Sequence, residues 1–200
     1  MPAAEVTQAL TDWEQRLRGL GARGASQLRP GLSPAQIDAI SNEFGVQLPE
    51  DAVAIWAWHD GEDVAAGSTA LAPYRAFHPL REALNLSRAW TQDAVARGFA
   101  EDEAFAHVTF RADFVPVLGY QLPLVLDCTD PHATSTTTVV WTPDGGLQDM
   151  PHLTMVERIT WWHWALDHGA WSISPDGAWS VDFTRYPGAG GDLSVKDVLS

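Results

Sequence analysis

The chain has 200 residues, of which 46% are hydrophobic and 19% are charged, so it has enough apolar side chains for a core and too few charges for a disordered chain. Its net charge of −14 disfavours nucleic acids and anionic membrane surfaces as partners, because both are negatively charged. The same charge favours a basic protein partner, although it also has the simpler explanation that it keeps the chain soluble.

Cysteine usage and apolar runs indicate the compartment. Cys128 is the single cysteine, which excludes an intramolecular disulfide and is typical of a reducing environment. The sequence shows no secretory signal at its start and no run of about 18 apolar residues that would span a membrane. We therefore expect a cytoplasmic protein.

The first part of the chain predicts three helices. Apolar residues at steps of three and four place an amphipathic helix at residues 6–20, followed by a Gly/Arg/Ser linker that reaches Pro30. Ser33-Pro34 begins a second helix, which Gly45 ends. A third helix opens at Leu48-Pro49-Glu50-Asp51, where proline and carboxylates suit a helix start, and it stops at residues 59–61.

The remaining chain predicts a mixture of strands and helices. Residues 62–73 predict a loop, residues 74–77 a short strand and residues 79–97 a helix, whereas residues 99–113 show no clear pattern. Further elements follow in this order: strands at 114–118, 122–126 and 137–141, a turn at 143–146, a helix from 155 to 166, and a hairpin of 171–173 with 179–183. Helices that precede short strands, with one returning helix, predict an α+β fold.

The whole chain, residues 1–200, predicts a single domain. Residues 1–24 form its leading helix and linker, and residues 187–200 form a loose tail rich in Pro and Gly at its start.

Residues 28–61 resemble the SUKH superfamily, which contains Smi/Knr-like fungal cell-wall regulators and bacterial immunity proteins. The matching residues are Leu32-Ser33, Ile37, Phe44-Gly45-Val46, Leu48-Pro49-Glu50-Asp51 and His59-Asp60-Gly61. The family often has a glutamate four residues before the motif glycine, where this chain has Ser41. In this motif Gly45, Leu48, Pro49 and Gly61 are residues of the fold rather than of a site.

The resemblance implies a mainly antiparallel sheet with helices packed against it and no common catalytic mechanism. It implies a protein-binding function, in the manner of bacterial immunity proteins that neutralise secreted toxins, often nucleases. The alternative is a regulatory or signalling scaffold with an endogenous partner, in the manner of the fungal members. Both are analogies from the fold, which does not by itself decide function.

An acid-rich segment is the first candidate site for such a partner. Between Pro30 and Asp63 there is no Lys or Arg, and the carboxylates are Asp38, Glu43, Glu50, Asp51, Asp60, Glu62 and Asp63. We expect the loop acids Asp60, Glu62 and Asp63 to contact a basic toxin domain, with Glu50 and Asp51 beside them. The alternative is that Asp38 and Glu43 lie on a solvated helix face, while Glu50 and Asp51 only complement a helix start.

Three tryptophans on one predicted helix are the second candidate site. Trp161, Trp162 and Trp164 cannot all face the same core, since residues on a helix turn by about 100° each. An exposed Trp161 would be an interface anchor. The alternative is a wide apolar face that is buried on both sides.

Catalytic and metal chemistry find little support in the sequence. Cys128 and His132 are four residues apart, which would suit a thiol hydrolase or half a zinc site, but no second cysteine and no further ligand spacing accompany them. The chain has no phosphate-binding glycine loop and no nucleophile elbow. We therefore predict no enzyme activity, no catalytic residue, no metal and no cofactor.

Overall fold

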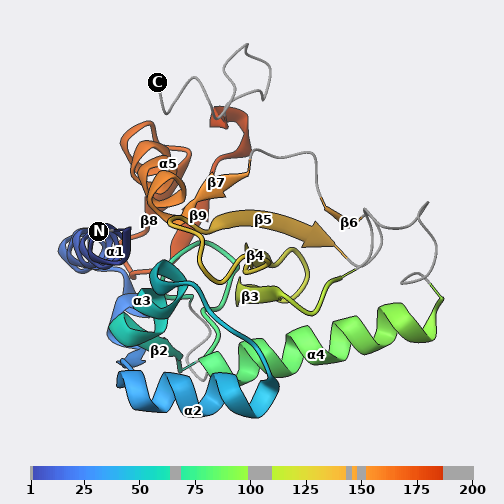
Figure 1. Ribbon diagram of the computed structural model, residues 1–200. Coiled ribbons are helices and arrows are strands. Elements are labelled where there is room, and N and C mark those ends of the chain that lie inside the picture. Colours follow the sequence, from blue (N-terminus) through green and yellow to red (C-terminus); the bar gives the residue numbers. More distant parts are fainter. Residues whose placement is uncertain (1, 64–68, 99–109, 143–145, 148–151, 187–200) are drawn as a thin grey trace.

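The computed structural model describes residues 2–63, 69–98, 110–142, 146–147 and 152–186 (Figure 1). The helices are α1 (Pro2–Gly19), α2 (Pro34–Phe44), α3 (Glu50–Trp58), α4 (Leu80–Ala96) and α5 (Met155–Asp167). The strands are β1 (Leu28–Pro30), β2 (His59–Glu62), β3 (Phe114–Leu118), β4 (Leu124–Asp127), β5 (Thr137–Thr142), β6 (Gly146–Leu147), β7 (Leu153–Thr154), β8 (Trp171–Ile173) and β9 (Trp179–Val181). The predicted turn at 143–145 and the predicted tail at 187–200 lie outside the described residues, as do residues 99–109.

The central sheet is antiparallel, which confirms the predicted α+β class. Its strands have the order β3-β4-β5-β6, and β7 pairs with the start of β5. The pairs β1–β2 and β8–β9 form two separate antiparallel ribbons. In Figure 1 α4 lies below the sheet, whereas α1, α3 and α5 gather at its left side. The leading helix is part of this body, because α1 packs against both α3 and α5.

Side chains of the central strands alternate between two cores, as the period of two along a strand requires. One core is shared with the helices and receives residues such as Val115, Leu126 and Val140. The other core consists of Phe110, Phe114, Val125, Val139 and Trp141, against which Trp90 of α4 packs. Both faces of the sheet are therefore covered.

The predicted local signals begin and end α2. Ser33 and Gln36 form a reciprocal capping box at the start of α2, and Gly45 closes it with a left-handed φ of 70°. A second capping box, Thr154 with Glu157, starts α5. Along α1 the apolar face is buried as far as Leu17, but Leu20 is exposed because the helix ends at Gly19.

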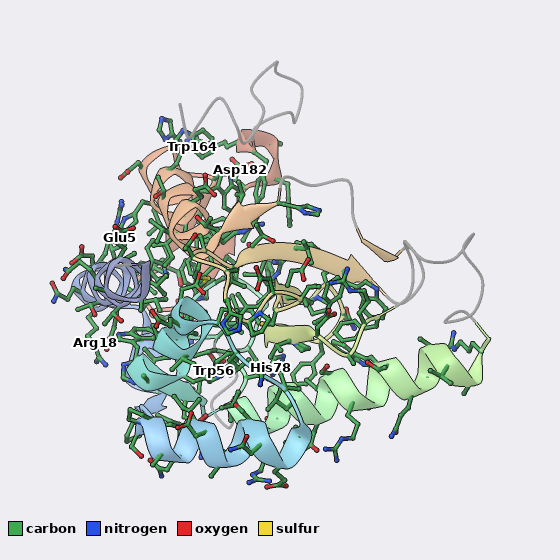
Figure 2. All side chains as sticks on the ribbon, in the orientation of Figure 1. Glu5, Arg18, Trp56, His78, Trp164 and Asp182 are labelled. Carbon is green, nitrogen blue, oxygen red and sulfur yellow. The ribbon has the colours of Figure 1, made fainter. Side chains whose placement is uncertain are left out.

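Tryptophans fix the interior through their ring nitrogens. Trp13 Nε1 donates to the carbonyl of Leu71 at 2.9 Å, and Trp56 Nε1 donates to the carbonyl of His78 at 3.1 Å. Figure 2 shows Trp56 and His78 inside the molecule, where both are buried. These bonds join α1 and α3 to the segment that precedes α4.

The structure corrects four local predictions. The predicted linker contains β1, and the predicted loop begins with the end of β2, because these strands pair across about 30 residues. Residues 74–77 form isolated bridges, such as Phe77 with Leu118, but no strand, and Tyr74 has a φ of 62° that turns the chain. The strand predicted at 122–126 begins only at Leu124, after the exposed Leu122 and the buried Pro123.

Candidate functional site

Glu62, the central residue of the predicted acidic loop, is buried, so its predicted exposure is wrong. Only 3% of its surface is accessible. Its Oε2 accepts a hydrogen bond from the backbone N–H of Ala70 at 2.7 Å, while Oε1 has no partner among the described groups. Burial raises the pKa of Glu62 to about 7, against the opposing effect of the backbone hydrogen bonds. Glu62 is therefore a structural carboxyl that holds the segment around Ala70.

The other two acids of the predicted loop, Asp60 and Asp63, have different surroundings. Asp60 is half-buried, and its Oδ1 accepts from the backbone N–H of Leu80 at 2.8 Å, which caps the start of α4. Asp63 is exposed. Of the three predicted contact acids, only Asp63 is therefore fully exposed.

The two acids at the start of α3, Glu50 and Asp51, also differ in burial. Glu50 is exposed, whereas Asp51 is buried and accepts the backbone N–H of Thr136 at 2.6 Å as well as the Thr136 hydroxyl. Asp51 therefore joins α3 to the start of β5, a role beyond complementing the helix dipole. Around them Pro49 is buried and Leu48 packs against the core, in keeping with roles in the fold.

Trp161 is buried, so it is not the exposed anchor considered from sequence. Trp161 and Trp162 both lie in the main core, and Trp164 is partly buried with its ring stacked on His168 at 4.4 Å between centroids. Trp161 packs edge-on against Trp171 of β8, with 5.1 Å between ring centroids. The wide buried face, covered by the C-terminal hairpin, is the alternative that the structure supports.

Trp161 nevertheless borders a cavity of about 560 Å³, which we call the aromatic–arginine pocket. Its lining comes from residues 72–75, residues 119–122, Arg158, Trp161 and Trp162 of α5, Trp171 of β8, and Phe183 and Tyr186. The volume lies within the range of ligand pockets, roughly 300–1,000 Å³. Five separate parts of the chain therefore meet at this cavity.

The rim of the aromatic–arginine pocket is unusually apolar. Six large hydrophobic side chains are exposed in the described part of the chain, and four of them line this pocket: Tyr74 (74%), Phe183 (66%), Leu122 (50%) and Tyr120 (46%). The other two, Leu20 and Val95, do not line it. Apolar side chains that cluster at the surface mark sites of interaction, whereas scattered ones need no explanation.

Two arginines line the same pocket. Arg158 is only 5% exposed, and its Nε and Nη2 both donate to the hydroxyl of Thr138 at 3.2 Å. Burial lowers the pKa of Arg158 to about 10, and the nearby positive charge of Arg75 lowers it further in the same direction. Burial also lowers the pKa of Arg75, which lies near the phenol of Tyr186. The two guanidinium groups are thus close enough to repel each other.

Charge is segregated at this pocket. The chain has 26 acidic residues against 12 basic ones, yet no acidic residue is among the described residues that line the pocket. A cavity with arginines at its wall and aromatic rings around them suits an anionic group attached to a planar or apolar body. That is the chemistry which this arrangement supports.

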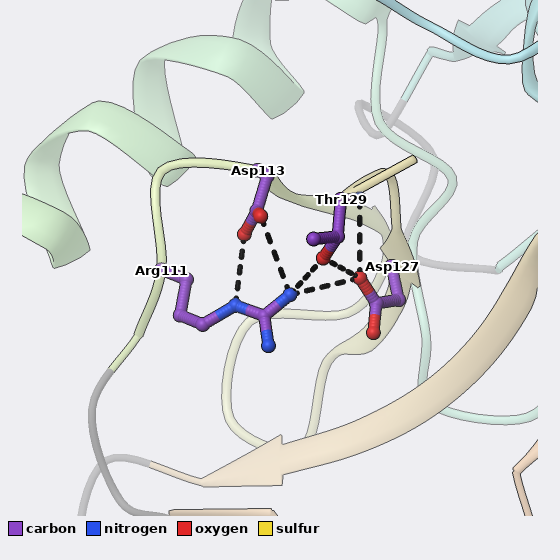
Figure 3. A network of polar contacts seen from close by, with 4 residues as sticks. All are labelled: Arg111, Asp113, Asp127 and Thr129. Atoms are coloured by element: carbon purple, nitrogen blue, oxygen red, sulfur yellow. Dashed lines mark hydrogen bonds and ion pairs between the residues drawn. The ribbon is translucent and has the colours of Figure 1, made fainter. Parts of the chain in front are cut away.

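A second polar cluster is satisfied internally. Arg111 donates from Nε to Asp113 at 2.9 Å and from Nη2 to Asp127 at 3.0 Å, and Thr129 joins the network (Figure 3). Between these acids, burial first and then the neighbouring carboxylates raise the pKa of the Cys128 thiol far above its usual range. The thiol therefore lacks the low pKa that a nucleophile needs.

Two absences hold for the residues that the structure describes. Within them, no three or more His, Cys, Asp or Glu side chains group in a way that could hold a metal ion. No helix in the same residues combines the length and the apolar composition required to cross a membrane.

No protein-family model matches the chain, and no curated protein matches it significantly. The resemblance of residues 28–61 to the SUKH superfamily therefore stays a prediction. The functional assignment rests on the geometry of the aromatic–arginine pocket.

The sequence analysis missed this pocket apart from Trp161. One local signal was available: Arg158 follows Met155 by three residues and precedes Trp162 by four, so it occupies the apolar face of α5. An arginine at such a position is unusual, since charged residues are rarely fully buried without a polar partner. The residues of the rim carry no comparable signal.

Proposed function

We propose that this protein acts by binding a partner protein through the face that contains the aromatic–arginine pocket. One observation carries the proposal: four of the six exposed large hydrophobic side chains surround a pocket whose wall contains Arg75 and Arg158. Tyrosine, tryptophan and arginine dominate the energetic centres of protein interfaces, and these residue types make up much of this pocket.

Within this proposal, the partner is a toxin domain that the protein neutralises, as the resemblance of residues 28–61 implies. The net charge of −14 and exposed acids such as Glu50 and Asp63 would attract a basic toxin surface. The pocket would receive one anionic anchor of that partner. The single cysteine, which is buried and reduced, supports a place in the cytoplasm for this encounter.

The test is capture of partners from the native cell extract by three tagged proteins. The first is the unaltered chain, the second carries Tyr74→Asn and Phe183→Ser at the pocket rim, and the third carries Leu20→Ser and Val95→Ser. Asparagine at position 74 tolerates the left-handed backbone. The third protein is a matched control, because it removes two exposed hydrophobic side chains that lie away from the pocket.

We expect a partner that the unaltered chain and the control retain and the rim variant loses. Neutralisation is then tested by co-expressing the identified partner with the unaltered chain or with the rim variant. A toxic partner should become harmless with the unaltered chain and stay toxic with the rim variant. Equal capture by all three proteins would show that this face is not the binding surface. A partner that is a non-toxic regulatory protein would contradict neutralisation and support the alternative, a regulatory scaffold.

A further inference from the structure

We infer that the aromatic–arginine pocket is a carboxylate site, which holds an acidic group next to an aromatic or bulky apolar side chain of the partner protein. This inference rests on the proposed function and specifies the chemistry of the partner's anchor. The acid-rich segment predicted that the partner contributes basic groups to the contact. At this pocket the partner instead contributes an acidic group, although the chain as a whole is acidic.

Arg75 supplies the first step of the argument. In the described part of the chain its guanidinium forms no hydrogen bond and no ion pair, although the side chain is partly buried. Arg158 lines the same cavity, and the positive charge of Arg75 adds to the effect of burial in lowering the pKa of Arg158. A guanidinium in this position offers parallel N–H donors that match one carboxylate in a two-bond contact.

The backbone holds Arg75 at the cavity. Tyr74 has a φ of 62°, the single positive φ of a non-glycine residue in the described segments, and it directly precedes Arg75. Gly119 leaves room for the arginine stem, because a Cβ there would lie 3.2 Å from Arg75 Cγ. Strained backbone of this kind concentrates at ligand sites, where the surrounding structure keeps it in place.

The aromatic walls supply the second step. Trp171 is fixed by donation of its Nε1–H to the Tyr186 hydroxyl at 2.6 Å, and it in turn packs against Trp161. The rings are therefore positioned before any ligand arrives, which lowers the entropy lost on binding. Trp161 Nε1 is buried with no hydrogen-bond partner among the described groups, so this wall also contains an unsatisfied donor.

A carboxylate fits this pocket better than a doubly charged phosphate. The wall is mostly apolar and one of its two arginines already donates to Thr138, so the cost of removing a dianion from water would be poorly compensated. A singly charged carboxylate requires less compensation, and an attached ring gains contact with the aromatic wall.

The experiment measures binding of N-acetylphenylalanine to the full chain by calorimetry. Its neutral amide is the matched control ligand, and inorganic phosphate tests for an anion without the ring. We expect the carboxylate to bind, the amide to bind at least about tenfold more weakly, and phosphate alone to bind more weakly than the carboxylate. Equal binding of the amide or of phosphate would overturn the carboxylate site.

Two protein variants complete the design. Arg75→Gln keeps most of the side-chain length but removes the charge, and we expect about a tenfold loss of carboxylate affinity. Arg97→Gln is the control, because Arg97 is exposed and paired with Asp93 at the end of α4, away from the pocket. Unchanged affinity in Arg75→Gln, with its fold intact by circular dichroism, would overturn the inference. Arg158 is too deeply buried to serve as the main test.

The outcomes separate this inference from the proposed function. Binding of the probe without any partner loss in the rim variant would support the carboxylate site and refute the proposed function. Loss of the partner in the rim variant, without binding of the probe, would support the proposed function and refute the carboxylate site. If both hold, N-acetylphenylalanine should compete with the partner, and absence of competition would overturn the assignment of the site to the partner's anchor.

Discussion

Asp51 and Thr136 are 85 residues apart in sequence, and the carboxylate of Asp51 accepts both the backbone N–H and the hydroxyl of Thr136. The same carboxylate accepts from the N–H of Ala52 at 2.9 Å. One buried side chain therefore connects the first turn of α3 to the start of β5. This contact joins the helical half of the molecule to its sheet.

Removal of this carboxylate should destabilise the fold. We expect Asp51→Ala to lower the free energy of unfolding by about 2–4 kcal/mol, because buried donors of Thr136 lose their acceptor. Urea titration followed by tryptophan fluorescence measures the change. Glu50→Ala is the control, and we expect a change within about 0.5 kcal/mol since Glu50 is exposed. Equal effects at both positions would contradict the structural role of Asp51.

Glu62 should make stability depend on pH. Its pKa is about 7 in the folded protein against an ordinary value of 4.5, so the folded state binds this proton more tightly than the unfolded state. Its contribution to stability is therefore largest below pH 4.5 and is lost as the pH rises to about 7, by on the order of 2–3 kcal/mol.

The slope of unfolding free energy against pH tests this role of Glu62. Glu62→Gln should flatten the slope in that window, since the amide does not titrate. Asp63→Asn, a change at the exposed neighbour, should preserve it. An unaltered slope in Glu62→Gln would show that other groups cause the pH dependence.

Gly61 and Gly45 offer a comparison of two left-handed glycines. Gly61 has a φ of 76°, and a Cβ there would lie 2.3 Å from the backbone nitrogen of Pro79. Gly45 has a φ of 70° with open space around its Cα. We expect Gly61→Ala to cost on the order of 3 kcal/mol or more, and Gly45→Ala about 1 kcal/mol from backbone strain alone. Thermal unfolding of both variants gives the comparison, and equal losses would refute the close contact.

Cys128 should react slowly with alkylating reagents in the native protein. The thiol is buried, and burial with nearby carboxylates raises its pKa, so little thiolate exists at about pH 8. We expect the rate of modification by iodoacetamide to rise sharply once urea unfolds the chain. Rapid native alkylation would indicate an accessible, activated thiol and revive the hydrolase alternative.

Elements that depend on neighbouring residues could be predicted from sequence. The helices α2 and α5 follow from apolar spacing with a capping residue, and the hairpin β8–β9 follows from its turn residues. The ribbon β1–β2 could not, because its short strands pair with each other across the two helices that lie between them in sequence. The acidity of the loop was visible in the sequence, but the burial of Glu62, whose carboxylate accepts from the N–H of Ala70, was not.

The pocket shows the same limit. Its walls come together only when the turn at residues 72–75, the loop at 119–122 and the C-terminal segment fold onto α5. No pattern in the sequence predicts that these segments lie together. The ten tryptophans predicted large buried surfaces, but the sequence does not show that Trp161, Trp162 and Trp171 also line a cavity.

Association kinetics should separate the acidic surface from the pocket. Once a partner is identified, Glu50→Gln with Asp63→Asn should lower the association rate and weaken its dependence on salt, since exposed charges act mainly on diffusional encounter. Phe183→Ser at the pocket rim should instead raise the dissociation rate, because loss of a buried apolar contact acts after the complex has formed. Surface plasmon resonance at low and high salt measures both rates. A lower association rate in Phe183→Ser, with an unchanged rate in the acid variant, would show that the encounter takes place at the pocket. The net charge of −14 would then serve only to keep the chain soluble.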